Sequence, residues 1–416
     1  MVNLKDFNWT LLLTWASLAC IGLVAIYSAT LGEVSEFLPE QIQENFMRQS
    51  IWFAIGLTVL AFIQFVPPRT FQLFAFPFYL FCIFLMILTI FVGVEVSGSQ
   101  SWLRVGPFNL QPGELTKLAT ILAVASYLTG KRDASTGNLK TALVVVLLFA
   151  IPISLLFLQS EAGVALVYIG LLPIVLFWSG LPYAISLLMI SPAIIAYFTI
   201  IDLRLGILAA VVIMTIIFFI QQKKWLSLSS LLLGILIVIG TEVALHQVLQ
   251  PHQRARIEAF ANPTVDPQGI GWNIIQSTTA IGSGGLYGKG FMQGTQTQLR
   301  FLPEQWTDFI FCVIGEEFGF IGASIVMLLY LILFIKLLLM ANSHNHPFAQ
   351  MVMVSAAGLY FVHFVISMGS TTGLVPIIGI TLPFISYGGS ALLTNTILLA
   401  ICLNMDFYKR SFSIYR

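Results

Sequence analysis

The single carboxylate of Asp266 lies in the polar segment NPTVDPQGIGWNIIQS, which covers residues 262–277. It stands between two X-Pro steps and beside several glycines, so the backbone is stiff around the carboxylate and free to hinge next to it. By itself, the sequence VDPQG predicts only a turn. Whether Asp266 takes part in chemistry therefore depends on what surrounds this loop.

A second candidate is the pair formed by Glu114 and Lys117, in the sequence LQPGELTKLA. The Pro-Gly turn predicts a helix that opens at Glu114, and a spacing of three residues places both side chains on one helical face. A charge near the bilayer centre costs roughly 2.5–3.5 kcal/mol, so the pair requires an explanation. It is either a structural ion pair or part of a polar cavity that is open to the outside and binds an anion. Arg104 and Gln111, just upstream, favour the cavity.

Four acids follow in FLPEQWTDFIFCVIGEEFGFIG, where Pro303 fits the first turn of a helix. Glu304 and Asp308 are four residues apart, and Glu316 and Glu317 are adjacent inside an apolar helix. Adjacent residues point about 100° apart on a helix, so at most one of these two faces lipid. The acids are expected either to cap helices and form interhelical hydrogen bonds or to hold a divalent cation.

The sequence TTGLVPIIGITLPFISYGGS, residues 371–390, is interrupted repeatedly by Gly and Pro. Its backbone cannot be regular helix throughout. Irregular backbone at membrane depth is tolerated only against protein or a water-filled cavity. We therefore expect Ser386 and Tyr387 near a cavity wall. The glycine-rich GSGGLYGKG, which contains Lys289, lacks the spacing of a phosphate-binding loop.

The elements that position these residues are expected to be membrane helices. The chain has 416 residues, 58% of them hydrophobic and 9% charged, whereas soluble domains carry about 25% charged residues. No basic cluster suits nucleic acid, and the four cysteines fall in apolar runs, as small buried hydrophobes do. A span needs about 20 apolar residues. Twelve segments qualify: 9–30, 50–66, 70–92, 114–129, 141–158, 164–179, 183–201, 205–221, 225–246, 309–340, 348–369 and 383–405.

The distribution of basic residues predicts the orientation of these spans. With a cytoplasmic N-terminus, the short outside loops carry only Arg48, Arg104 and Arg204. The inside then carries eleven basic residues: Lys5, Arg69, Lys131, Arg132, Lys140, Lys223, Lys224, Lys336, Lys409, Arg410 and Arg416. This positive-inside bias predicts that both termini are cytoplasmic. The large loop 247–307, with Asp266, then faces outward, and the segment 31–49 is expected to form a short amphipathic helix on the outer surface.

Four blocks together resemble the SEDS family of membrane-embedded peptidoglycan glycosyltransferases, along nearly the whole chain. They are LQPGELTKLA, RARIEAFANPTVDPQGIGWNIIQSTTAIGSGGLYGKG, QLRFLPEQWTDFIFCVIGEEFGFIG and GLVPIIGITLPFISYGGS. The third block and the glycine-rich end of the second are most similar to the elongation branch of the family. Two positions depart from the family pattern: Glu161 stands where an Asp is usual, and Ser367 where an Asn is common.

The resemblance implies a single membrane domain, residues 1–416, with a ten-helix core. Since the chain has twelve candidate spans, the segment 183–221 is expected to be an added helical hairpin. The very short turn between 183–201 and 205–221 requires these two helices to lie antiparallel and adjacent. An inserted pair leaves every other loop on its original side of the membrane.

The resemblance also implies polymerisation of lipid II into glycan strands, with release of undecaprenyl diphosphate, at the outer face of the bacterial cytoplasmic membrane. Asp266 matches the proposed catalytic Asp of the family. The residues expected to bind substrate are Glu114, Lys117, Arg104, Gln111, Lys289, Asp308, Ser386 and Tyr387. Mg²⁺ or another divalent cation could assist, whereas no nucleotide or organic cofactor is expected. The implied partners are a class B penicillin-binding transpeptidase and other membrane proteins of cell elongation. The alternatives are a flippase for lipid-linked precursors and a non-catalytic scaffold.

Overall fold

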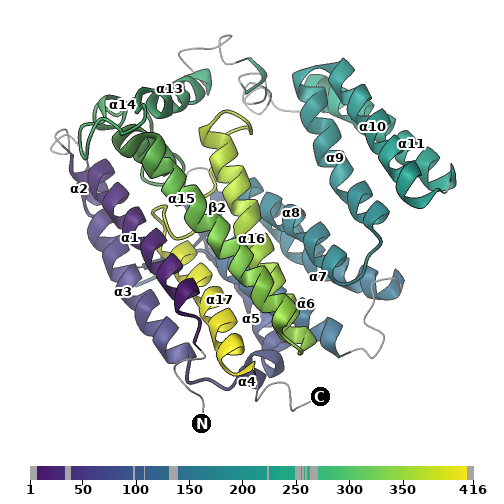
Figure 1. Ribbon diagram of the computed structural model, residues 1–416, viewed down its shortest axis with the longest axis horizontal. Helices are drawn as coiled ribbons and strands as arrows, with labels where there is room; N and C mark the ends of the chain where they lie inside the picture. The colour runs from purple at the N-terminus through teal and green to yellow at the C-terminus, as the bar shows by residue number, and fades with distance from the viewer. Residues whose placement is uncertain are drawn as a thin grey trace.

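The structure is a computed structural model that describes residues 7–32, 39–96, 99–106, 108–130, 139–222, 224–248, 254, 257, 260–262 and 270–409. Long helices dominate these residues, as the sequence predicts (Figure 1). Nine of them form the main bundle: α1 (Trp9–Leu31), α3 (Asn45–Ile63), α5 (Ala75–Val92), α6 (Pro112–Thr129), α7 (Leu139–Leu158), α8 (Ala162–Trp178), α15 (Ile310–Ser343), α16 (Pro347–Thr371) and α17 (Gly389–Phe407).

Two helices occupy the centre of the main bundle. In α16, 83% of the membrane-length window is buried by protein, and in α17 the share is 72%, whereas it is 22% in α3. Helix α16 packs against α15, α8 and α6, and α17 packs against α3 and α6. Polar side chains on α6 and α16 can therefore face protein instead of lipid.

All twelve segments predicted as spans contain a helix. Among the described residues, ten helices are long and apolar enough to cross a membrane. The other two are α8, which has 17 residues, and α6, which is less apolar because it contains Glu114 and Lys117. The chain is thus a multi-pass membrane protein. Twelve crossings and the cytoplasmic location of both termini remain predictions.

Two predicted boundaries are wrong. The last span begins at Gly389 and not at residue 383, because Phe384 adopts a positive φ of 70° and the residues after Pro383 form turns. In the segment 31–49, the described residues contain only the short helix α2 (Glu40–Gln43), and α3 already begins at Asn45. In the first turns of α3, the buried side chain of Gln49 binds Ser386 O and Gly388 N.

A small antiparallel sheet between α5 and α6 was not predicted. Its strands are β1 (Val94–Val96), β2 (Ser99–Val105) and β3 (Phe108–Leu110), in the order β1-β2-β3. Gly106, with a φ of 61°, lies in the turn between β2 and β3, where a left-handed conformation is available to glycine without a steric cost. A single residue, Gln111, separates the end of the sheet from the start of α6, so the sheet fixes where that helix begins.

Three helices form a separate unit beside the main bundle: α9 (Tyr183–Ile201), α10 (Leu203–Gln221) and α11 (Lys224–Val243) (Figure 1). They share a hydrophobic cluster of their own, which includes Ile195, Ala210 and Val238. Helix α9 joins the unit to the main bundle by packing on α8. The predicted antiparallel pair α9–α10 is therefore present, with α11 as a third member. That residues 183–221 are an addition to a ten-helix core remains a prediction.

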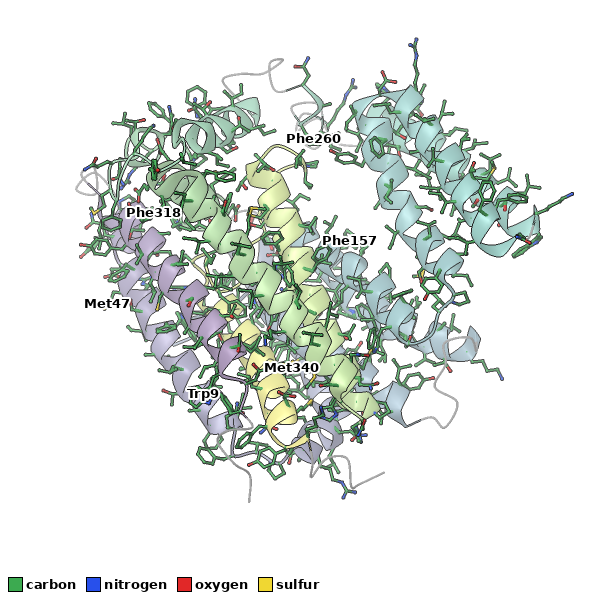
Figure 2. All side chains as sticks on the ribbon, viewed as in Figure 1. Trp9, Met47, Phe157, Phe260, Phe318 and Met340 are labelled. Carbon is green, nitrogen blue, oxygen red and sulfur yellow. The ribbon has the colours of Figure 1, made fainter. Side chains whose placement is uncertain are left out.

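Side chains project from all three helices of this unit, as Figure 2 shows. Its exposed apolar residues include Ile207 and Phe219 on α10 and Leu232 on α11. Farther along the chain, Phe260 is buried and its ring centroid lies 5.9 Å from that of Tyr197 on α9. The chain segment that leads toward Asp266 is thus packed on α9.

The close packing of α10 on α11 can be tested with a pair of cysteines. A Cβ placed on Gly234 would lie 2.7 Å from the Cβ of Ala210, whereas one on Gly240 meets no described atom within 4 Å. A disulfide needs a Cβ separation of about 3.5–4.5 Å, which a small shift of α11 provides. With Cys20 changed to Ser, we expect Ala210→Cys/Gly234→Cys to cross-link under mild oxidation and Ala210→Cys/Gly240→Cys not to do so. Equal cross-linking of both pairs on gel analysis would contradict this arrangement.

Candidate functional site

The ion pair of Glu114 and Lys117 is fully buried in the first turns of α6. Pro112 occupies the first turn of the helix, where a missing N–H does no harm, and Glu114 sits where the helix dipole favours an anion. Lys117 Nζ lies 2.8 Å from Glu114 Oε1, and the two side chains are 1% and 5% exposed. The sequence predicted the contact. It did not predict that protein would enclose the pair on all sides.

His363 of α16 is the third member of this cluster. Its Nε2 lies 2.8 Å from Lys117 Nζ, and its Nδ1 lies 3.2 Å from Thr381 O. His363 was missed because the contact joins helices that are far apart in the sequence. The only signal was a single histidine inside a long apolar segment, and such a residue has no evident partner before the fold is known.

The cluster has hydrogen-bonding capacity that the described residues do not use. Glu114 Oε2 is buried and has no hydrogen-bond partner among them. An ammonium group has three donors, and Lys117 directs two of these, to Glu114 and His363. A buried carboxylate oxygen without a partner is costly in a protein interior. The cluster therefore keeps one donor, on Lys117, and one acceptor, on Glu114, without a partner among the described residues.

Gln111 and Glu161 fix the start of α6. Gln111 Nε2 donates to Glu161 Oε1 over 3.1 Å, and the same oxygen accepts hydrogen bonds from Ser99 Oγ, at 2.8 Å, and Ser101 Oγ. Glu161, at a position that departs from the family pattern, thus ties β2 to the residue before α6. Gln111 is engaged in this contact, whereas Arg104 on β2 is exposed.

The residues between α16 and α17, which we call the 372–388 segment, connect the parts of the site. Ser386 Oγ donates to Thr307 O over 2.6 Å and accepts from Leu382 N, and Tyr387 N donates to Trp306 O. Ser386 therefore has a clear structural role, because it holds the segment to the chain just before α15. The predicted irregular backbone is confirmed.

Asp308 lies against the 372–388 segment, because a Cβ on Gly379 would be 3.3 Å from Asp308 Oδ2. Gly379 is two residues before Thr381. Burial raises the pKa of Asp308 to about 6, the charge of Glu304 adds to this rise, and a hydrogen bond with Thr307 opposes it. Because Thr381 binds His363, two residues of one segment, Gly379 and Thr381, connect Asp308 with the cluster that contains the ion pair.

Lys289 belongs to a different cluster. Its Nζ lies 2.7 Å from Glu316 Oε1, and Glu316 also accepts from Gln296 N and Thr297 N in α14 (Thr295–Gln298). The neighbouring Glu317 accepts a hydrogen bond from Ser28 Oγ of α1. Glu316 thus binds the N–H groups at the start of α14, and Glu317 forms an interhelical hydrogen bond with α1. Lys289 is the counter-ion of Glu316 and lies apart from Glu114 and Lys117.

The described residues do not fit a divalent cation. No group of three or more His, Cys, Asp or Glu among them is arranged to hold a metal ion. Glu114 is paired with Lys117, and the carboxylate of Glu316 already accepts hydrogen bonds from Lys289 and two backbone N–H groups. We therefore assign no step of the chemistry to Mg²⁺.

Asp266 lies outside the described residues, but the chain on both sides of it is placed. Phe260 packs on α9, as described above. Helix α13 (Ile270–Ser283) packs on α15 and α16, and Trp272 Nε1 donates to Phe301 O over 2.8 Å. A Cβ on Gly373 would lie 3.2 Å from the Ile274 side chain, so α13 also touches the start of the 372–388 segment.

Comparison with known proteins identifies relatives along the whole chain. A family model described as cell cycle protein, of the FtsW, RodA and SpoVE group, matches residues 8–209 and 185–411. The peptidoglycan glycosyltransferase RodA of Treponema pallidum is 30% identical over 432 residues, which cover 97% of this chain and 98% of the relative. The peptidoglycan glycosyltransferase MrdB of Escherichia coli K12 is 31% identical over 360 residues, 86% of this chain and 85% of the relative.

Solved structures share the fold. A chain from a peptidoglycan synthase complex, described as coordinating polymerization and crosslinking, matches with a TM-score of 0.73 and 26% identity, over 96% of this chain and 97% of that chain. RodA of Thermus thermophilus matches with a TM-score of 0.62 and 24% identity, over 97% of each chain, and supports the fold alone. The two matches of the family model overlap at residues 185–209, within the predicted added hairpin.

The geometry of the ion pair predicts how its variants behave. Lys117→Met leaves the buried carboxylate of Glu114 without a counter-ion, which usually costs about 3–5 kcal/mol. Replacing both residues, with Glu114→Gln and Lys117→Met, leaves no buried charge. We therefore expect the double variant to unfold at a higher temperature in detergent than Lys117→Met alone. An equal or lower melting temperature for the double variant would exclude an electrostatic coupling between the two residues.

The raised pKa of Asp308 predicts that the stability of the folded protein depends on pH. Its pKa in the folded protein lies near 6, above the ordinary value of 3.8, so the folded state loses stability as pH rises from about 4 through 6. Asp308→Asn removes this ionisation. We expect the melting temperature of the variant to exceed that of the parent by more at pH 7 than at pH 4.5. Burial also raises the pKa of Glu304, but Glu304 is present in both proteins, so the difference between their melting temperatures reports on Asp308. A difference in melting temperature that stays constant between pH 4.5 and pH 7 would refute the prediction.

Proposed function

Because the chain belongs to the SEDS family of FtsW, RodA and SpoVE proteins, we propose that it polymerises lipid II into glycan strands during cell elongation. It is a peptidoglycan glycosyltransferase, as its relatives are. The observation that carries this conclusion is the match over nearly the full length of both chains, 97% of this chain and 98% of RodA of Treponema pallidum.

In the proposed reaction, the 4-hydroxyl of the acceptor GlcNAc attacks the anomeric carbon of the growing strand. A new C–O bond forms as the bond to undecaprenyl diphosphate breaks, and the diphosphate leaves with the bonding electrons. Ordinary inverting glycosidases need one carboxylic acid and one carboxylate. A diphosphate leaves as a stable anion, so a single base suffices. We assign this role to Asp266, which accepts the hydroxyl proton.

An aspartate with an ordinary pKa near 3.9 is a weak base for a sugar hydroxyl. Asp266 can therefore take the proton only as the new bond forms, and positioning must supply much of the rate. Two features of the structure support this requirement. The segment before Asp266 is packed on α9 through Phe260, and α13, which begins four residues after it, is packed on the main bundle.

The charged residues suit different parts of the substrate. The charge of Lys117 is already balanced by Glu114 at 2.8 Å, so Lys117 acts as a directed hydrogen-bond donor and not as an isolated cation. Arg104 is exposed on β2, just before α6, and is the better candidate to meet the diphosphate. Asp308 contacts the 372–388 segment at Gly379, whereas the Tyr387 side chain interacts with Arg48 of α3.

The reaction is proposed to take place at the outer face of the cytoplasmic membrane, where the basic-residue pattern predicts that Asp266 lies. We propose a class B penicillin-binding transpeptidase as the partner, within a group of elongation proteins. A solved relative comes from a synthase complex that couples polymerization and crosslinking, which supports this pairing.

The test is a polymerisation assay with purified protein and lipid II, run with and without a partner transpeptidase. Asp266→Asn should lower the rate at least 100-fold, the lower end of what a general base contributes, with no loss of melting temperature. Asp202→Asn is the matched control. It makes the same change in an outer turn, and Asn caps a helix as well as Asp does, so Asp202 at the start of α10 stays a competent cap.

Near-parental polymerisation by a folded Asp266→Asn variant would remove Asp266 from the mechanism. A parent protein that moves lipid II across vesicles without polymerising it would instead favour a flippase. Polymerisation only by an added partner would favour a scaffold.

A further inference from the structure

His363 has two hydrogen bonds that together determine its protonation state. A carbonyl oxygen can only accept, so the 3.2 Å contact between His363 Nδ1 and Thr381 O requires a proton on Nδ1. An ammonium can only donate, so the 2.8 Å contact with Lys117 Nζ requires a bare Nε2. One neutral tautomer satisfies both contacts. The histidine is 1% exposed, so protein surrounds both contacts.

These two contacts join two parts of the site. Lys117 lies on α6 and Thr381 lies in the 372–388 segment, whose Gly379 approaches Asp308. A shift of Thr381 by a fraction of an ångström would turn the imidazole and change the direction in which Lys117 donates its remaining proton. A leucine of similar size would fill the same space but could not transmit this constraint.

We propose that His363 is a positioning residue for glycan polymerisation: it orients the Lys117 ammonium toward substrate by linking it to Thr381 of the 372–388 segment. The inference rests on the proposed function, since it assigns a step in the use of lipid II. His363 does not itself touch the reacting atoms. It acts through Lys117, whose third donor is then held in one direction.

Three substitutions separate the two contacts of His363. In His363→Gln, the amide oxygen can take the place of Nε2 and accept from Lys117. In His363→Asn, the shorter amide can take the place of Nδ1 and donate only to Thr381. His363→Leu loses both contacts. The control is Tyr360→Phe, one turn away on α16, which removes a buried hydrogen bond to Asn395 O without touching the ion pair.

The measurements are kcat and KM for lipid II polymerisation, the melting temperature, and the rise in melting temperature on adding lipid II. We expect His363→Leu and His363→Asn to lower kcat roughly 10- to 100-fold, as losing a hydrogen bond to a charged group would. His363→Gln should keep kcat within about threefold of the parent. Tyr360→Phe should lower the melting temperature while kcat per folded protein stays unchanged. The stabilisation by lipid II should follow the same order as kcat.

A folded His363→Leu variant with parental kcat and parental stabilisation by lipid II would overturn the inference while leaving the proposed function intact. Rescue by Asn and not by Gln would also overturn it, because the contact with Thr381 alone would then matter. A parent that binds lipid II without polymerising it would refute the proposed reaction, and the order of stabilisation among the variants would still decide the role of His363. A parent that neither binds nor polymerises lipid II would remove both proposals.

Discussion

A buried lysine–glutamate pair inside a membrane helix is the constraint on which the rest of the site depends. Glu114 and Lys117 are enclosed by protein, and neither charge is tolerable there without the other. The pair requires polar neighbours at membrane depth, and α16 supplies one as His363. It also requires that α6 begin at a fixed place, which the sheet and the contact between Gln111 and Glu161 ensure. Helix α16, which supplies His363, is accordingly buried by protein over 83% of its membrane-length window.

The 372–388 segment must also satisfy its polar groups at membrane depth, as the buried ion pair does. Its non-helical backbone has N–H and C=O groups that no helix satisfies, and inside a membrane each needs a partner. Side chains from distant helices meet this need: Gln49 binds Ser386 O, Tyr330 donates to Pro383 O, and His363 binds Thr381 O. The same contacts hold the segment between Asp308 and the ion pair. The 372–388 segment, whose irregular backbone the sequence predicts, is thus held in place and connects the parts of the site.

The sequence predicts the helices and the local pair, but not the contacts that cross the bundle. Hydropathy alone locates all twelve helical segments, and the spacing of Glu114 and Lys117 alone predicts their contact. His363 could not be found this way, because its partner lies 246 positions away. The strands at 94–110 were missed because short polar strands resemble loops in a single sequence. Lys289 was assigned to substrate because its counter-ion, Glu316, is brought to it only by the folded chain.

The two lysine–glutamate pairs show how a structural pair differs from a functional candidate. Both have an N–O distance near 2.8 Å. The carboxylate of Glu316 is saturated, since Lys289 and the N–H groups of Gln296 and Thr297 occupy both oxygens, and its lysine is partly exposed. The carboxylate of Glu114 has one oxygen without a described partner, and its lysine is buried and aligned by His363. A saturated pair can only hold a fold together, whereas a rigid pair with spare hydrogen-bonding capacity can also bind a substrate.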